Sequence, residues 1–216
     1  MLEVRPCTND DFAEFVRIQI AAFNTAKGIT RLMKPPASVE NIEKGIQKHI
    51  KSAESEPDVS YLKVVDTELG DKMIAGAKWR INDKERTEEQ IQSMLPVPGE
   101  KEKDRPAAQD FMNYLYRVRK EFMGTKPFAF LHMLIVDPGH QRRGAGALLV
   151  KWGLDLADKA QLPSFLEASE AGKKLYTSLG YEPVAMEIFD LSKYDSNFSG
   201  LESNTAMVRN AVQPQK

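Results

Sequence analysis

The segment from Leu134 to Gly146 restricts the fold of this 216-residue chain more than any other part of the sequence. An apolar run with strand character leads into an Asp-Pro-Gly turn at Asp137. A basic loop with glycines at positions 144 and 146 follows, and then a helix-forming run. Such a loop presents consecutive main-chain N–H groups at a helix N-terminus, where the helix dipole is positive. Because glycine lets a ligand approach the backbone closely, we expect a cradle for a pyrophosphate group here.

Composition and charge exclude several classes of function. The formal net charge of −1 provides no general attraction to nucleic acids or anionic membranes, so neither is predicted as a partner. The single cysteine, Cys7, excludes an internal disulfide and is expected to be a small packed residue. We expect no metal site, because no spacing of histidine, cysteine and carboxylate residues is typical of one. Without a signal-peptide core or a membrane-spanning apolar run, a cytoplasmic location is expected.

The order of the predicted strands and helices indicates an α/β chain with one central mixed sheet and helices on both faces. A capping box of Thr8 and Asp11 precedes the first helix, and Ser38 is placed to cap the second. We expect one domain over 1–210 with a short tail, 211–216, and a helical insertion, 82–127, between the third and fourth strands. The predicted strands cover 2–5, 61–66, 73–81, 128–136, 164–168, 183–191 and 205–209, and the main helices cover 12–23, 39–53, 111–122, 147–160 and 171–179.

Three interpretations of the glycine loop compete. The simplest is a strand-to-helix turn that needs glycine only for its geometry. A dinucleotide-binding fingerprint would require a third glycine or alanine where the chain has Leu149, and its first glycine would follow the strand almost directly. Only about 50 residues follow Glu167, too few for the second half of such a sheet. A Walker A loop is excluded, because no Lys-Ser or Lys-Thr pair follows Gly146.

The third interpretation comes from a resemblance. Gln141, Gly144 and Gly146 fill the main signature of the GNAT superfamily of acyl-CoA-dependent N-acyltransferases, directly after a strand and before a helix. Downstream, 171–181 looks like the family's final helix, which carries a tyrosine and ends in glycine and an aromatic residue. The resemblance is specific over 128–191, and the strand and helix order over 2–81 agrees with it. It implies the GNAT fold, a central, mostly antiparallel sheet flanked by helices, whereas the insertion is not part of the family's common core.

The resemblance also implies acetyl-CoA as co-substrate. Backbone groups of Leu134 and Val136 would pair with the pantetheine arm, and main-chain amides would bind the pyrophosphate. For the two arginines a solvated face is an open alternative, and Ser169 could equally cap a helix. The cofactor-binding residues expected on this basis are Leu134, Ile135, Val136, Gln141, Arg142, Arg143, Gly144, Ala145, Gly146, Ala147 and Ser169.

Two residues are candidates for catalysis. Tyr176 matches the family's tyrosine that protonates the departing thiolate. His132 is a candidate base because its unperturbed pKa of ~6.5 suits proton transfer, although a structural role is open. The family often has a glutamate as the base on this strand, and at the matching position this chain has Phe130. Glu167 is a second candidate base or a surface charge, while His49, like His140, is expected in a solvated or loop position.

These expectations predict an N-acetyltransferase that transfers acetyl directly to a primary amine of a small molecule or protein. A non-catalytic acyl-CoA sensor on the same fold is the alternative, because fold does not determine activity. We expect a monomer or homodimer. The insertion is placed to act as a lid over the acceptor, with Tyr114, Tyr116 and Phe122 available to line it; an exposed decoration or a dimer contact is the other interpretation.

Overall fold

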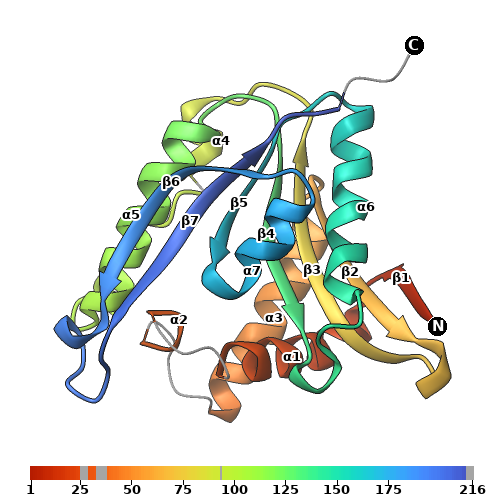
Figure 1. The fold of residues 1–216 in the computed structure, drawn as a ribbon, viewed down its shortest axis with the longest axis horizontal. Helices are drawn as coiled ribbons and strands as arrows, with labels where there is room; N and C mark the ends of the chain where they lie inside the picture. The colour runs from red at the N-terminus through yellow and green to blue at the C-terminus, as the bar shows by residue number, and fades with distance from the viewer. Residues whose placement is uncertain (25–28, 33–37, 93, 213–216) are drawn as a thin grey trace. The chain divides into compact units, whose positions relative to one another are not determined.

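The computed structural model describes residues 1–24, 29–32, 38–92 and 94–212, so the last residues of the expected tail, 213–216, lie outside it. The chain divides into two compact units. Figure 1 shows the course of the chain through its helices and strands. The first unit consists of Met1–Ala26, Pro35–Ile81 and Ala129–Lys159, and the second of Lys27–Lys34, Asn82–Phe128 and Ala160–Lys216.

The first unit carries four strands in the order β1-β2-β3-β4. Strand β2 pairs antiparallel with both β1 and β3. Its helices are α1, α3 and α6. The bounds are β1 Leu2–Pro6, α1 Phe12–Asn24, α3 Val39–Ser55, β2 Val59–Asp66, β3 Lys72–Asn82, β4 Phe128–Val136 and α6 Ala145–Lys159.

Helices cover both faces of this part of the sheet, as two consecutive residues of β3 show. The Lys78 ammonium donates to Ser52 of α3 at 2.8 Å, on one face. The Trp79 ring packs against Gly153 of α6 and its Nε1 donates to the Leu149 carbonyl at 3.1 Å, on the other. Because successive strand residues point to opposite faces, α3 and α6 sandwich the strand.

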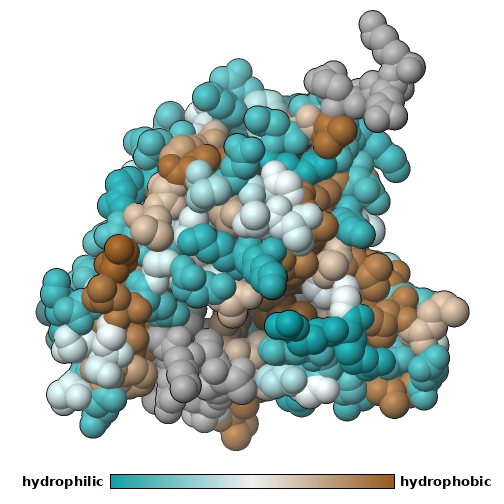
Figure 2. Space-filling view, in the orientation of Figure 1, coloured by the Kyte–Doolittle hydropathy of each residue, from teal (hydrophilic) through white to brown (hydrophobic). Residues whose placement is uncertain are grey.

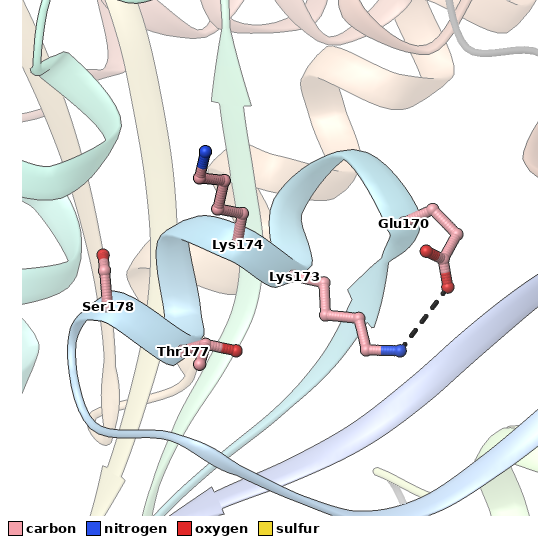
Figure 3. Close-up of a pocket in the computed structure, with 5 residues that line it drawn as sticks. All are labelled: Glu170, Lys173, Lys174, Thr177 and Ser178. Atoms are coloured by element: carbon pink, nitrogen blue, oxygen red, sulfur yellow. Dashed lines mark ion pairs between the residues drawn. The ribbon is translucent and has the colours of Figure 1, made fainter.

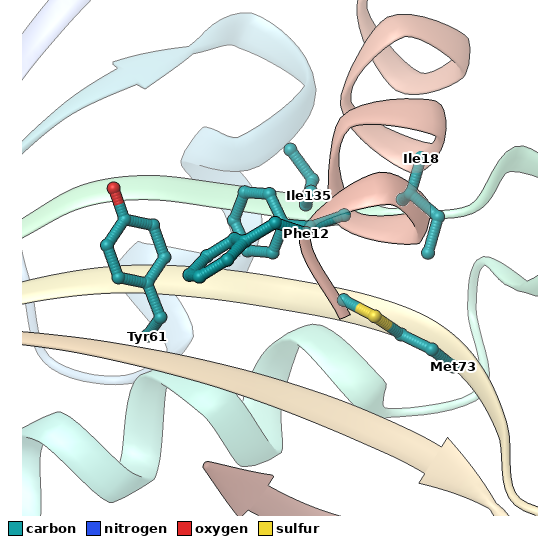
Figure 4. Packing of buried hydrophobic residues seen from close by; sticks show 6 residues of the cluster. Phe12, Ile18, Tyr61, Met73 and Ile135 are labelled. Carbon is teal, nitrogen blue, oxygen red and sulfur yellow. The ribbon is translucent and has the colours of Figure 1, made fainter. Parts of the chain in front are cut away.

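A cluster of buried side chains joins α1 to the sheet in the first unit (Figure 4). The Phe12 and Tyr61 rings meet edge to face, with centroids 5.0 Å apart. Cys7 packs against this cluster, and burial raises the pKa of its thiol to about 12. Cys7 is therefore the small packed residue that the sequence predicts. The buried members of the cluster are Phe12, Phe15, Ile18, Tyr61, Met73 and Ile135.

The second unit carries three antiparallel strands in the order β5-β7-β6. The Phe122 ring of α5 stacks on Phe165 of β5, with centroids 6.4 Å apart, whereas α7 packs against β5 and β7. The bounds are α2 Ile29–Leu32, α4 Glu88–Gln92, α5 Pro106–Phe122, β5 Ser164–Ser169, α7 Glu170–Ser178, β6 Glu182–Asp190 and β7 Leu201–Arg209.

The fold class and the local signals predicted from sequence are confirmed. Thr8 and Asp11 form the capping box, and the Ser38 side chain accepts from the amide of Asn41. Strands β2 and β3 form the expected hairpin, with left-handed residues at Gly70 and Asp71. The expected α/β class, the antiparallel pairing and the helical insertion between β3 and β4 are all present.

Two expectations about α3 are wrong. The sequence places apolar residues at helical spacing along this helix from Val39 to Ala53, which predicts one buried face, yet Val39 is 86% exposed and Ala53 is exposed too. His49, expected in solvent, is buried, and its Nδ1 lies 2.9 Å from the Tyr61 hydroxyl while its Nε2 lies 3.1 Å from the Gln19 side chain. The periodicity failed here because the inward face of α3 is partly polar, and buried polar groups need partners that only the tertiary structure supplies.

On the surface, hydrophobic side chains gather over β6 (Figure 2). Val184, Met186 and Ile188 alternate along this strand, and each is exposed. Within the described ranges, no helix is both long and apolar enough to cross a membrane.

Candidate functional site

The glycine loop begins where β4 ends at Val136. The Asp137 carboxylate caps the following turn, Pro138–His140, by accepting from the Gly139 amide at 3.0 Å. It also forms an ion pair with Arg17 of α1 at 2.5 Å, which holds the pKa of the carboxyl below its usual range against the opposing effect of burial. The Asp137 amide in turn donates to the Ile74 carbonyl of β3 at 2.9 Å, so the Asp-Pro-Gly turn is tied to both α1 and β3.

The loop backbone adopts two left-handed conformations. Arg142 has φ +63° and Gly144 has φ +90°, after which α6 starts at Ala145. A Cβ on Gly144 would meet no atom within 4 Å, so this position favours glycine for its backbone conformation and not for space. Left-handed residues among right-handed ones are the conformations from which anion-binding nests of main-chain amides are built.

The amides of this loop lack hydrogen-bond partners in the part of the chain that the structure describes. Among the described residues, no main-chain N–H from Gln141 to Ala147 donates a hydrogen bond, and the first helical bond runs from the Leu148 amide to the Gly144 carbonyl. Seven consecutive amides, those of Gln141, Arg142, Arg143, Gly144, Ala145, Gly146 and Ala147, are thus available at the positive end of a 15-residue helix. This arrangement suits an anion with several oxygens, such as a pyrophosphate.

The two arginines of the loop differ. Arg143 forms an ion pair with the buried Asp66 at 2.5 Å, and its other amino group lies 3.0 Å from the His140 ring. Arg142 is exposed. Arg143 therefore fixes the loop to β2, while Arg142 is the arginine whose charge can meet a ligand.

The β4 residues of the predicted site divide between core and surface. The Ile135 side chain is 1% exposed within the α1 cluster, so only its backbone is available to a cofactor. Leu134 and Val136 are half-buried. His132 is half-buried too, with its ring 5.2 Å from that of the fully buried Phe130.

Tyr176 belongs to the second unit, on α7. Its side chain is buried, and burial raises the pKa of the phenol. Gly172, one turn earlier, makes room for the ring, since a Cβ there would lie 2.8 Å from Tyr176 Cε2. In the described part of the chain the Tyr176 hydroxyl makes no hydrogen bond. The structure thus holds a protonated phenol in place by packing and leaves its O–H without a partner.

The Gly-aromatic end of α7 has a structural role. Gly180, at φ +87°, donates to the Thr177 carbonyl, and the Tyr181 amide donates to the carbonyl of Tyr176 at 3.1 Å, which together end the helix. The Tyr181 hydroxyl lies 2.5 Å from Ser164 Oγ on β5. Ser169 is the N-cap residue of α7, although its side chain makes no cap hydrogen bond.

Comparison with known proteins identifies the family. Residues 29–181 match the acetyltransferase (GNAT) family, over more than half of the chain. The chain is a member of the GNAT family. The expected GNAT fold and the resemblance to this family are therefore confirmed.

Relatives and solved structures agree with this membership. A probable acyltransferase of Ajellomyces capsulatus is 47% identical over 45 residues, 21% of this chain and 33% of the relative. An uncharacterised N-acetyltransferase of Schizosaccharomyces pombe is 36% identical over 89 residues, 41% of this chain and 37% of the relative. The matches thus span only about a third of the length of each relative. Arylalkylamine N-acetyltransferase 2 of Aedes aegypti shares the fold, with a TM-score of 0.67 at 13% identity over 98% of this chain and 99% of that one.

Glu167, a candidate base of this GNAT protein, is not a surface charge. Its carboxylate receives two hydrogen bonds from Arg119 of α5, at 2.6 and 3.2 Å, and both side chains are less than a tenth exposed. Arg119 also donates to the Met94 carbonyl at 3.0 Å. A carboxylate held by a bidentate, buried arginine is poorly suited to accept a proton from a substrate.

The insertion is an integral part of the second unit. Tyr114, expected to line a lid, is 1% exposed, and its hydroxyl donates to the Asn204 carbonyl of β7 at 3.2 Å. Phe122 stacks on β5, and Phe111 lies against Phe189 of β6. Tyr116 is half-buried. The interpretation of the insertion as an exposed decoration is therefore wrong, and removing α5 would strip one face of these strands.

A shallow pocket lies on the surface of α7 (Figure 3). Lys173 points along the helix toward Glu170 and pairs with it at 3.6 Å, while Lys174 points away. The pocket is lined by Glu170, Lys173, Lys174, Thr177 and Ser178, so it includes no residue expected in the site. Among the described residues, no three histidine, cysteine or acidic side chains gather as metal ligands would.

Proposed function

We propose that this chain is an acetyl-CoA-dependent N-acetyltransferase that transfers the acetyl group directly to a primary amine of a small molecule or protein. The seven unpartnered amides from Gln141 to Ala147, in a member of the GNAT family, carry this proposal. They fit a pyrophosphate because they are consecutive, lie at a helix N-terminus and include the left-handed Gly144.

Other residues of the chain would take distinct parts in the reaction. Acetyl-CoA supplies a thioester as the acyl donor. The backbone of Leu134 and Val136 would align the pantetheine arm, and an amide there would stabilise the developing oxyanion. Tyr176 would donate its proton to the leaving thiolate, since its raised pKa keeps the phenol protonated at neutral pH. His132 would accept the proton of the attacking amine, directly or through water.

Titration calorimetry tests the cradle. The wild-type chain is expected to bind acetyl-CoA, and Gly144→Ala to bind it about tenfold more weakly. A left-handed alanine costs roughly 1–2 kcal/mol, so the loop relaxes and its amides lose their common direction. Gly139→Ala is the matched control, because a Cβ there makes only an ordinary contact of 3.5 Å with Asp137.

Thiol release with a panel of amines then tests the transfer. Release that depends on both acetyl-CoA and an amine supports the proposal. Binding without release for any amine would indicate a sensor, and the absence of binding to folded protein would reject the cradle itself.

A further inference from the structure

The glycine loop is joined to the sheet of the first unit by one of its two arginines. The Arg143 guanidinium pairs with the Asp66 carboxylate of β2 at 2.5 Å and donates to His140 Nδ1 at 3.0 Å. Gln141 and Arg142 are exposed, and neither side chain makes a hydrogen bond or an ion pair with the described residues. Arg143 therefore supplies the polar contact between the loop and the sheet.

The backbone of this loop needs such a contact. Arg142 adopts φ +63°, a left-handed conformation that is unfavourable for a residue with a side chain. Within the described ranges, the amides of residues 141–147 make no hydrogen bond that would compensate for it. A strained backbone persists only where the surrounding structure holds it, and Arg143 directly follows the strained residue. The pair of Arg143 and Asp66 thus lies where the loop most needs support.

Asp66 is a rigid partner for this arginine. It is the last residue of β2 and is paired with Leu2 of β1 on one side and Lys72 of β3 on the other. Its side chain is 1% exposed, and Oδ1 accepts from the Glu68 amide at 3.2 Å while Oδ2 faces the guanidinium. The Arg143 guanidinium holds the pKa of this carboxyl below its usual range. A charged carboxylate at a fixed point of the sheet is therefore available to hold the loop.

We propose that Asp66 is a positioning residue for the cofactor: through Arg143 it holds the glycine loop in the conformation in which the amides of 141–147 bind a pyrophosphate. This inference rests on the acetyl-CoA site proposed above. Asp66 acts without touching the ligand, and the charge of Arg143 is engaged by Asp66 before a ligand arrives. Because the loop is ordered when the chain folds, binding does not carry the entropy cost of ordering it.

Asp66→Asn tests this role, because it keeps the shape of the side chain and removes its charge. Acetyl-CoA should bind this variant about tenfold more weakly in titration calorimetry, since the ligand must then order the loop itself. The KM for acetyl-CoA should rise by a similar factor, while kcat and the KM for the amine stay unchanged, because the reacting atoms are not affected. Asp71→Asn is the matched control: Asp71 lies in the same hairpin and forms an exposed pair with Arg5 at 3.0 Å.

A double-mutant cycle tests whether Asp66 acts through Arg143. Arg143→Met should also weaken binding about tenfold. The double variant Asp66→Asn with Arg143→Met should be no weaker than either single variant, because the two side chains act as one unit. A combined loss of about a hundredfold would mean that Arg143 contacts the ligand independently of Asp66, and would overturn the proposal.

The order of the loop can be measured without any ligand. The nuclear magnetic resonance order parameter of the Gly144 amide should be about 0.85 in the wild type and fall below about 0.6 in Asp66→Asn. Asp71→Asn should retain the wild-type value. An unchanged signal of Leu154, which is buried in α6, shows that each variant is folded.

The outcomes separate this inference from the proposed function. Wild-type order of Gly144 in Asp66→Asn, or wild-type affinity for acetyl-CoA, overturns the role of Asp66 and leaves acetyl transfer intact. Binding without thiol release from any amine rejects the transfer and leaves both tests of Asp66 in force. If the wild type binds no acetyl-CoA, the proposed function fails, and the order of Gly144 still decides whether Asp66 holds the loop.

Discussion

Tyr176 and Tyr181 are both buried on the same short stretch of chain, yet their hydroxyl groups are used differently. Tyr181 shares a hydrogen bond with Ser164, whereas the Tyr176 hydroxyl makes none within the described residues. A phenol that contributes nothing to the hydrogen bonding of the fold is available for chemistry.

Tyr176→Phe should therefore lower kcat by about a hundredfold, the usual effect of losing a general acid, and leave stability almost unchanged. Tyr181→Phe should show the opposite pattern: a loss of about 1 kcal/mol in stability and no change in kcat. Steady-state thiol release and thermal unfolding measure the two effects. Full turnover by Tyr176→Phe at every pH would remove the acid from the mechanism.

Single residues also show where sequence reasoning ends. The signature residues Gln141, Gly144 and Tyr176 stand out because their spacing is local and matches a family. The surface-charge interpretation of Glu167 was wrong because its partner, Arg119, lies 48 residues earlier in the chain. No pattern within a few residues of Glu167 indicates that a guanidinium will be buried beside it.

At the level of elements, α5 is held to the strands by contacts of unequal strength. Arg119 and Glu167 form a buried bidentate pair. Two residues earlier, Arg117 pairs with Glu187, with side chains 59% and 36% exposed. The first pair leaves a desolvated charge behind when it is broken, and the second is screened by water.

Arg119→Met should lower the free energy of unfolding by about 3–5 kcal/mol, because it leaves the Glu167 carboxylate buried without its cation. The double change Arg119→Met with Glu167→Leu should recover most of this loss. Arg117→Met, the matched control, should cost less than about 1 kcal/mol. Urea denaturation followed by circular dichroism measures all three, and equal losses at the two arginines would contradict the assignment of the buried pair.

Helices and hairpins were predictable wherever a signal and its effect are close in the chain. The capping box at Thr8, the Ser38 cap and the turn at Gly70 all act within four residues. The amphipathic period of α5 predicted a helix but not which strands it covers, since that depends on β6 and β7, which come much later in the sequence.

At the scale of the whole molecule, the free energy of unfolding should depend on pH through the buried His49. Burial lowers the pKa of His49 to about 4, with nearby Lys78 acting in the same direction. In the unfolded chain, where the histidine pKa is ~6.5, His49 binds a proton below that pH. In the folded chain His49 stays neutral until the pH approaches about 4. Stability is full above pH ~6.5 and is lost as pH falls from that value toward about 4.

Through His49 alone, this loss amounts to something of the order of 3 kcal/mol. His49→Gln should be less stable than the wild type at pH 7, since it breaks a buried network, but should show a flatter decline on acidification. Fluorescence of Trp79 and Trp152, both in the first unit, reports the unfolding. His140→Gln is the control, and an identical slope in wild type and His49→Gln would refute the prediction.

The close approach of α6 to β3 has a consequence for how this chain tolerates change. Gly153 has no side chain, and the Trp79 ring occupies the space that a Cβ would need, so the depth at which α6 sits is determined by an aromatic plane. The amides that open the same helix, from Ala145 to Ala147, lie six to eight residues upstream and move with it as a rigid body. A single methyl group added at position 153, which is outside the predicted cofactor site, would therefore tilt the N-terminal end of α6 and alter the affinity for the cofactor.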